Sequence, residues 1–196
     1  MSKEWLNIDD SPETLEQAHG KENRWWYLSS PKFQRAFLRP LAALIDSVGD
    51  GCLDIGCGEG LLGSLIVGRY IGIDGSQEAR RRGLLKAKRY TDVQQIRYGR
   101  IEDPPNDGML AKLDSVVFGG IMEVSVKPEH RAVMARAWMA SCWATNLFVY
   151  DLERLDDSLL RLEFGQPMIE CHLAATGLDI DPVKLRRKIL GWRIER

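Results

Sequence analysis

The sequence lacks the features that mark several large classes of protein. Its four cysteines contain no CxxC pair, and its three histidines are too scattered to complete a zinc site. It has no run of about 18 uncharged apolar residues, and residues 1–10 lack the apolar core of a signal peptide. These absences argue against a disulfide scaffold, a metal site and a membrane-spanning segment. They predict a cytoplasmic protein whose thiols are reduced and mostly buried.

An excess of charge of one sign is also missing. The chain has 27 Lys and Arg residues against 28 Asp and Glu residues, for a formal net charge of −1. Binding along a nucleic-acid backbone needs a clear cationic excess, so general nucleic-acid binding is not expected. A chain of 196 residues, 44% of them hydrophobic, is long enough for one globular domain that hides roughly 70% of its unfolded surface.

No repeat or flexible linker divides the chain. We therefore expect one domain over residues 31–196, preceded by a polar extension over residues 1–30. The extension ends in an aromatic cluster, Trp25, Trp26 and Tyr27. This cluster either pins the extension to the core or forms a lid over the substrate, since aromatic rings both pack in cores and stack on planar or cationic ligands.

Helical and strand patterns alternate along the domain. Apolar residues at helical spacing predict a helix that starts at Pro31 and is kinked or restarted at Pro40, and short runs rich in β-branched residues predict strands. The expected strands are residues 52–55, 70–73, 93–98, 114–118 and 146–151, and the expected helices are residues 61–67, 76–89, a segment opening at Pro128, and 166–175.

This alternation predicts an α/β fold. Parallel strands joined by helical crossovers form a doubly wound, mostly parallel sheet with helices on both faces. Residues 183–194 read as one or two strands, so we expect an antiparallel hairpin to close the C-terminal end of the sheet.

The segment from Leu53 to Gly63 reads LDIGCGEGLLG and carries the clearest chemical signal. Glycines directly after a strand allow a tight turn and let a ligand approach the main-chain amides, while a following helix would present its positive end. Asp74 ends the next strand, where a carboxylate faces the ligand crevice and accepts hydrogen bonds from ribose hydroxyls. An acid favoured by the dipole of the next helix is the plainer interpretation of Asp74.

The glycine spacing fits both a dinucleotide and another adenosine cofactor. The flanking residues favour the second, because Asp54 and Glu59 would repel a pyrophosphate but suit an ammonium or sulfonium cation.

On these residues the chain resembles the Rossmann-like (class I) S-adenosylmethionine-dependent methyltransferases. The resemblance covers roughly residues 31–180. It implies S-adenosylmethionine as cofactor and S-adenosylhomocysteine as product. It also implies that Asp54 and Gly56 hold the methionine amino end through water or main chain and that Gly58 packs close to the cofactor. Asp74 would bind the ribose hydroxyls, and Ile101 and Glu102 would line the adenine pocket. The other cofactor-binding residues that it implies are Cys57, Gly75 and Gly119.

The segment after the fourth expected strand, Phe118 to Val124, resembles a family segment in which an acid precedes histidine. Glu123 matches the acid and is the candidate catalytic residue, but Val124 replaces the histidine. Arg100 likewise stands where many members carry aspartate. The use of a general base therefore stays open.

We expect the methyl acceptor to be a small molecule. Basic clusters such as residues 80–89 and 184–193 usually form a solvated face. They nevertheless leave RNA as an alternative acceptor, and the fold by itself leaves a protein as another. The glycine spacing with Asp74 leaves an NAD(P)-dependent oxidoreductase as an alternative. The absence of the histidine and the presence of Arg100 leave a non-catalytic cofactor-binding protein as a further alternative.

Overall fold

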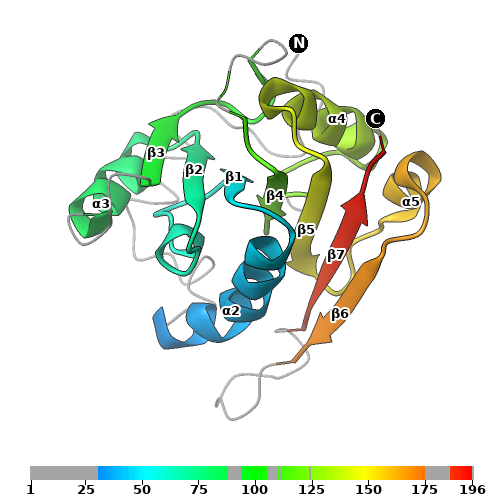
Figure 1. The fold of residues 1–196 in the computed structure, drawn as a ribbon, viewed down its shortest axis with the longest axis horizontal. Helices are drawn as coiled ribbons and strands as arrows, with labels where there is room; N and C mark the ends of the chain where they lie inside the picture. The colour runs from blue at the N-terminus through cyan, green and yellow to red at the C-terminus, as the bar shows by residue number, and fades with distance from the viewer. Residues whose placement is uncertain are drawn as a thin grey trace.

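The computed structural model describes residues 31–87, 94–105, 110, 112–123, 125–174 and 186–195. In this part of the chain, seven strands form one sheet with the order β3-β2-β1-β4-β5-β7-β6, which runs from left to right in Figure 1. The strands are β1 Gly51–Ile55, β2 Arg69–Asp74, β3 Gln94–Tyr98, β4 Ser115–Gly119, β5 Asn146–Leu152, β6 Ile169–Leu173 and β7 Arg187–Arg193.

The first five strands pair in parallel, whereas β7 pairs antiparallel with both β5 and β6. The expected fold class, a mostly parallel sheet closed by an antiparallel hairpin, is confirmed. The strand order reverses at β1, which lies between β2 and β4. In doubly wound sheets, ligands bind beyond the carboxyl ends of the strands at this switch point.

Helices cover both faces of the sheet, and for this reason all five residues of β1 are buried. The helix α2, Pro31–Val48, packs on one face of the sheet, and we call the core between them the α2-side core. The core on the opposite face includes residues of α4, Arg131–Cys142, and α5, Ser158–Phe164. The helix α3, Gln77–Ala87, packs on β2 and β3 at the left of Figure 1. The helix predicted from Pro31 is continuous through Pro40, and a short 3-10 turn, Pro128–His130, opens α4.

The helix expected over residues 61–67 is wrong, because the chain forms only a 3-10 turn, Leu62–Ser64. The return from β1 to β2 must span a five-residue strand, about 17 Å. The glycine turn takes residues 56–60, and the eight residues that remain would give an α-helix of only about 12 Å. The apolar pattern reflects burial of Leu62 and Ile66 in the α2-side core.

The helix expected over residues 166–175 is also wrong, since residues 169–173 form the edge strand β6. Ile169, Cys171 and Leu173 alternate with exposed residues and pack on the α2-side core. This period of two is typical of a half-buried strand, and β7 supplies the hydrogen-bonding partner.

Within the described residues, no helix combines the length and the apolar character that crossing a membrane requires. The N-terminal extension, with Trp25, Trp26 and Tyr27, lies outside the described residues, so its role as a lid or anchor stays a prediction.

Candidate functional site

The glycine turn after β1 is bound to the end of β2. The amides of Gly56 and Cys57 both donate to the carbonyl oxygen of Ile73, at 2.8 and 3.1 Å. The amide of Gly58 donates to Oδ2 of Asp74 at 2.7 Å, and Oδ1 of Asp74 accepts from the amide of Ser76 at 2.9 Å. Asp74 therefore joins the glycine turn to the turn that opens α3.

The glycines of this turn have different surroundings. Gly56 and Gly58 have φ of 72° and 56°, a region that disfavours residues with a side chain. A Cβ atom on Gly56 would lie 2.5 Å from Cγ2 of Ile121, whereas a Cβ atom on Gly58 would have no atom within 4 Å. Gly56 is therefore needed for packing against the loop after β4, and Gly58 borders open space.

Asp54 lies on β1, on the face of the sheet covered by α2, and is only 3% exposed. The hydroxyl group of Tyr70 donates to its Oδ2 atom at 2.6 Å. Burial raises the pKa of Asp54 to about 7, although the hydrogen bond from Tyr70 opposes the shift; Asp74 adds to it by charge repulsion. A cation bound beside Asp54 would favour the ionised carboxylate.

Gly119 ends β4 beside this carboxylate. A Cβ atom on Gly119 would lie 3.5 Å from Oδ1 of Asp54, and Gly119 pairs with Tyr150 of β5. The carboxyl ends of the central strands thus carry glycines, with Asp54 and Asp74 on the β1–β2 side and Tyr150 on the β5 side. Gly75 is half-buried in the bend that follows Asp74.

Cys57 packs inside the turn. Its Sγ atom lies 2.6 Å from the position that a Cβ atom on Gly72 would take. Burial raises the pKa of the thiol well above its usual range, and the charges of Asp54 and Asp74 raise it further. Cys57 is therefore a packing residue held as the neutral thiol, and a thiolate nucleophile is not favoured here.

The chain after β3 carries the residues expected at the adenine, and it begins with a hydrogen bond to Asp74. The amide of Gly99 donates to the carbonyl oxygen of Asp74 at 3.0 Å. Ile101 is buried in the core on the α4 side, and its carbonyl oxygen accepts from Nε1 of Trp138 at 2.7 Å. The carboxylate of Glu102 is buried and paired with Arg100. Their contact with an adenine stays a prediction.

Glu123 lies in the loop after β4, where its amide donates to Oδ2 of the fully buried Asp151 at 3.0 Å. Its Oε1 atom lies 2.5 Å from Nε of Arg154. Arg131 anchors the same loop by donating to the carbonyl oxygens of Met122 and Val126. The loop is thus held from β5 and α4.

Sequence reasoning missed two partners in this region. Tyr70 reads as an apolar strand residue, and only the pairing of Cys52 with Tyr70 brings its ring next to Asp54. Arg187 reads as part of a basic run, yet its guanidinium carbon lies 5.0 Å from the centre of the Tyr150 ring. To predict this contact, the register between β5 and β7 would have to be known.

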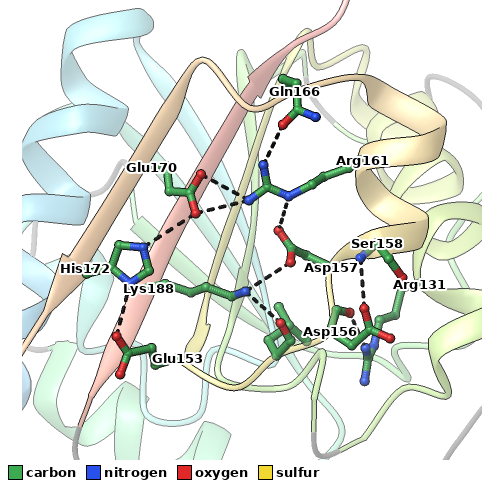
Figure 2. Close-up of polar contacts among 11 residues, drawn as sticks. Arg131, Glu153, Asp156, Asp157, Ser158, Arg161, Gln166, Glu170, His172 and Lys188 are labelled. Carbon is green, nitrogen blue, oxygen red and sulfur yellow. Dashed lines mark hydrogen bonds and ion pairs between the residues drawn. The ribbon is translucent and has the colours of Figure 1, made fainter.

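The described part of the basic clusters is largely paired with acids. Glu78 accepts from both Arg81 and Arg82. In the second cluster, Lys188 belongs to the network of Figure 2, where its Nζ atom donates to the Leu155 carbonyl oxygen at 2.7 Å and to Asp157 at 3.1 Å. Arg81 is exposed, as expected for a solvated face, but Lys188 is buried, so the expected solvated face is wrong at Lys188.

A cleft of about 670 Å³ lies at the opposite end of the sheet, lined by residues that include Asp46, Arg69, Lys112 and Asp114. Two of its acids already bind the backbone: Asp46 accepts from the amide of Val67, and Asp114 accepts from the amide of Asp50. Because ligands of doubly wound sheets bind at the carboxyl ends of the strands, the glycine turn is the better candidate site.

No protein-family model matches the chain, and no curated protein matches it. Solved structures match it over nearly its whole length. The N-methyltransferase NodS from Bradyrhizobium japonicum WM9, in complex with S-adenosylhomocysteine, has 14% identity and a TM-score of 0.71 and covers 96% of this chain and 100% of its own.

Magnesium protoporphyrin IX methyltransferase from Synechocystis PCC 6803, with bound S-adenosylmethionine, has 13% identity and a TM-score of 0.69 and covers 96% of this chain and 98% of its own. A protein from Pyrococcus horikoshii, provisionally named an RNA methyltransferase, has 13% identity and a TM-score of 0.59 and covers 94% of this chain and 98% of its own. The chain therefore has the fold of the Rossmann-like S-adenosylmethionine-dependent methyltransferases.

Proposed function

We propose that this protein is an S-adenosylmethionine-dependent methyltransferase with a small-molecule acceptor. The observation that carries the proposal is the pair of buried carboxylates, Asp54 and Asp74, beside a glycine turn that is open at Gly58. This site lies at the switch point of a sheet whose solved neighbours include methyltransferases with bound S-adenosylmethionine or S-adenosylhomocysteine.

The donor set fits this cofactor. Asp54 suits the methionine ammonium group, because a buried carboxylate gains most from a nearby cation. Asp74 suits the ribose hydroxyls, since its carboxylate oxygens are hydrogen-bond acceptors that the amides of Gly58 and Ser76 hold in place. The space at Gly58 supports close approach of a ligand to the main chain.

The oxidoreductase alternative is weaker for two reasons. A dinucleotide pyrophosphate would lie against the carboxylates of Asp54 and Asp74. It would also lack the helix N-terminus that binds pyrophosphate in such proteins, because a 3-10 turn of three residues, Leu62–Ser64, follows the glycines.

Bound S-adenosylmethionine would supply an electrophilic methyl group on its sulfonium. The protein's own part is to hold the acceptor atom in line with that group, with a base needed only if the acceptor loses a proton. Gly119, next to Asp54, presents no side chain to the acceptor, and Glu123 is the residue that would orient it. Glu123 is held in this loop by its ion pair with Arg154.

A small acceptor is favoured over RNA because the described basic side chains at residues 80–82 and 186–188 are mostly engaged by Glu78, Glu153 and Asp157. RNA binding that falls steeply with salt would support the RNA alternative instead.

Calorimetric titration with S-adenosylhomocysteine tests the proposal. We expect binding by the wild type and its loss in Asp74→Ala, while Asp103→Ala, which removes an exposed carboxylate from the loop after β3, binds normally. Normal binding by a folded Asp74→Ala would contradict the site. Fluorescence titration with NADH tests the oxidoreductase alternative. Cofactor binding without turnover across a panel of acceptors would indicate a non-catalytic protein.

A further inference from the structure

Arg187 is the first residue of β7. Because β7 runs antiparallel to β5, this residue lies at the carboxyl edge of the parallel strands, paired with Leu152 of β5 and Leu173 of β6. Its Nη1 atom lies 3.4 Å from the position that a Cβ atom would take on Gly120. The side chain therefore reaches the end of β4, next to the glycine that borders Asp54.

Arg187 differs from the neighbouring basic residues because they pair with acidic side chains. Arg154 pairs with Glu123 at 2.5 Å, Arg186 with Glu153 at 3.7 Å and Lys188 with Asp157 at 3.1 Å. Within the described residues, the guanidinium of Arg187 has no carboxylate within 4.0 Å, and it lies against the ring of the buried Tyr150. A half-buried cation is thus left with N–H donors that no described acid uses.

The contact with the Tyr150 ring is a cation–π contact, which does not neutralise the charge of the guanidinium, so its N–H groups can serve an anionic ligand. A planar fork of such donors matches a carboxylate or a phosphate, and an aromatic face limits the orientations that the fork can take. On the other side of Gly119 and Gly120 lie the two carboxylates, Asp54 and Asp74. The site is therefore acidic toward β1 and β2 and basic toward β7.

We infer that Arg187 binds an anionic oxygen group of the methyl acceptor, a carboxylate or a phosphate, next to Gly120. This inference rests on the proposed function. The acid side holds the cationic cofactor, and the acceptor lies between that side and Arg187.

Inorganic phosphate and acetate serve as probes in an NMR titration of the ¹⁵N-labelled protein saturated with S-adenosylhomocysteine. We expect saturable shifts of the Gly119 and Gly120 amides in the wild type. Arg187→Gln and Arg187→Met, the second of which keeps an apolar stem on Tyr150, should each weaken binding about tenfold or more. Arg193→Gln, which removes an exposed arginine from the other end of β7, should change it by less than about twofold.

The relative affinities of phosphate and acetate then distinguish the two kinds of anionic group. Absence of saturable shifts in the wild type, or equal affinity in the wild type and in either folded Arg187 variant, overturns the inference. Failure of the proposed function is separate, because it appears as absence of S-adenosylhomocysteine binding in the wild type. The same probes then titrate the unliganded protein and still decide the role of Arg187.

Discussion

The hydroxyl group of Tyr70 donates a 2.6 Å hydrogen bond to the carboxylate of Asp54, and both side chains are almost completely buried. The two residues lie on neighbouring parallel strands, on the face of the sheet covered by α2. Tyr70 is thus the hydrogen-bond donor that offsets part of the cost of placing a carboxylate inside the protein.

Removing this donor should change how cofactor binding depends on pH. The pKa of Asp54 is about 7, and Tyr70→Phe should raise it further, because the ionised form loses a hydrogen bond. If the ammonium group of S-adenosylhomocysteine binds the ionised carboxylate, wild-type affinity falls below pH 7, by up to about tenfold per pH unit. Calorimetry between pH 6 and 9 should place this fall in affinity at higher pH in Tyr70→Phe than in the wild type. Superimposable pH profiles of the two proteins would argue against this role of Tyr70.

Asp54 should also make the unliganded protein less stable as pH rises. Its folded-state pKa, about 7, exceeds the ordinary value of 3.8, so the folded state binds the proton more tightly. Stability is therefore fully present below about pH 4 and is lost as pH rises toward 7. Asp54→Asn does not titrate. Its free energy of unfolding relative to the wild type should increase between pH 4.5 and 7.5, by at most about 4 kcal/mol. Urea denaturation at several pH values measures this difference, and a constant difference would contradict the assignment.

Two glycines of one turn should respond differently to the same substitution. Gly56→Ala places a methyl group against Ile121 and also strains the backbone, so it should lower the free energy of unfolding by about 2 to 5 kcal/mol. Gly58→Ala meets no neighbouring atom and should cost only about 1 to 2 kcal/mol, from the backbone alone. Its main effect should be weaker binding of S-adenosylhomocysteine. Denaturation and calorimetry together test the contrast, and equal losses of stability would refute it.

The network of Figure 2 should contribute to stability without contributing to binding. Asp157 accepts from Arg161 and from the buried Lys188. Although burial alone raises the pKa of Asp157, these hydrogen bonds outweigh it and lower the pKa. The stabilisation is therefore present above about pH 4 and is lost as pH falls further.

Asp157→Asn should destabilise the protein at pH 7 by about 3 kcal/mol, because it leaves a buried ammonium without its counter-ion. Glu163→Gln is the matched control: it breaks the exposed pair with Arg136 and should cost less than about 1 kcal/mol. Thermal or urea denaturation compares the two variants. Equal effects, or a loss of S-adenosylhomocysteine binding in folded Asp157→Asn, would count against a purely structural role.

The parallel part of the sheet could be predicted from the sequence because its signals are local. Short β-branched runs separated by helical patterns predicted β1 to β5 within a few residues of their bounds, and the glycines after β1 predicted the turn. Acids at the tips of β1 and β2 could be identified because parallel strands present their carboxyl ends at one edge. The hydrogen bond from Gly58 to Asp74 agrees with that placement.

The failures arose where distant parts of the chain decide the local structure. Residues 61–67 have an apolar pattern that suits a helix, but a helix of these few residues would be too short to span the return from β1 to β2, and the chain forms only a 3-10 turn. Residues 169–173 alternate in burial as a strand does, but five residues are a short pattern, and pairing with β7 is what fixes the strand.

The sequence by itself determined the order of elements and the position of an acidic glycine turn, since backbone propensity and the hydrophobic period act over a few residues. Only the tertiary structure decided which side chains surround that turn. Tyr70 reaches Asp54, and Arg187 reaches Gly120 across Tyr150, because strand register brings together residues that no local pattern relates. Register depends on the packing of the whole sheet, and therefore the charge distribution of the site could be derived only after the strands were paired.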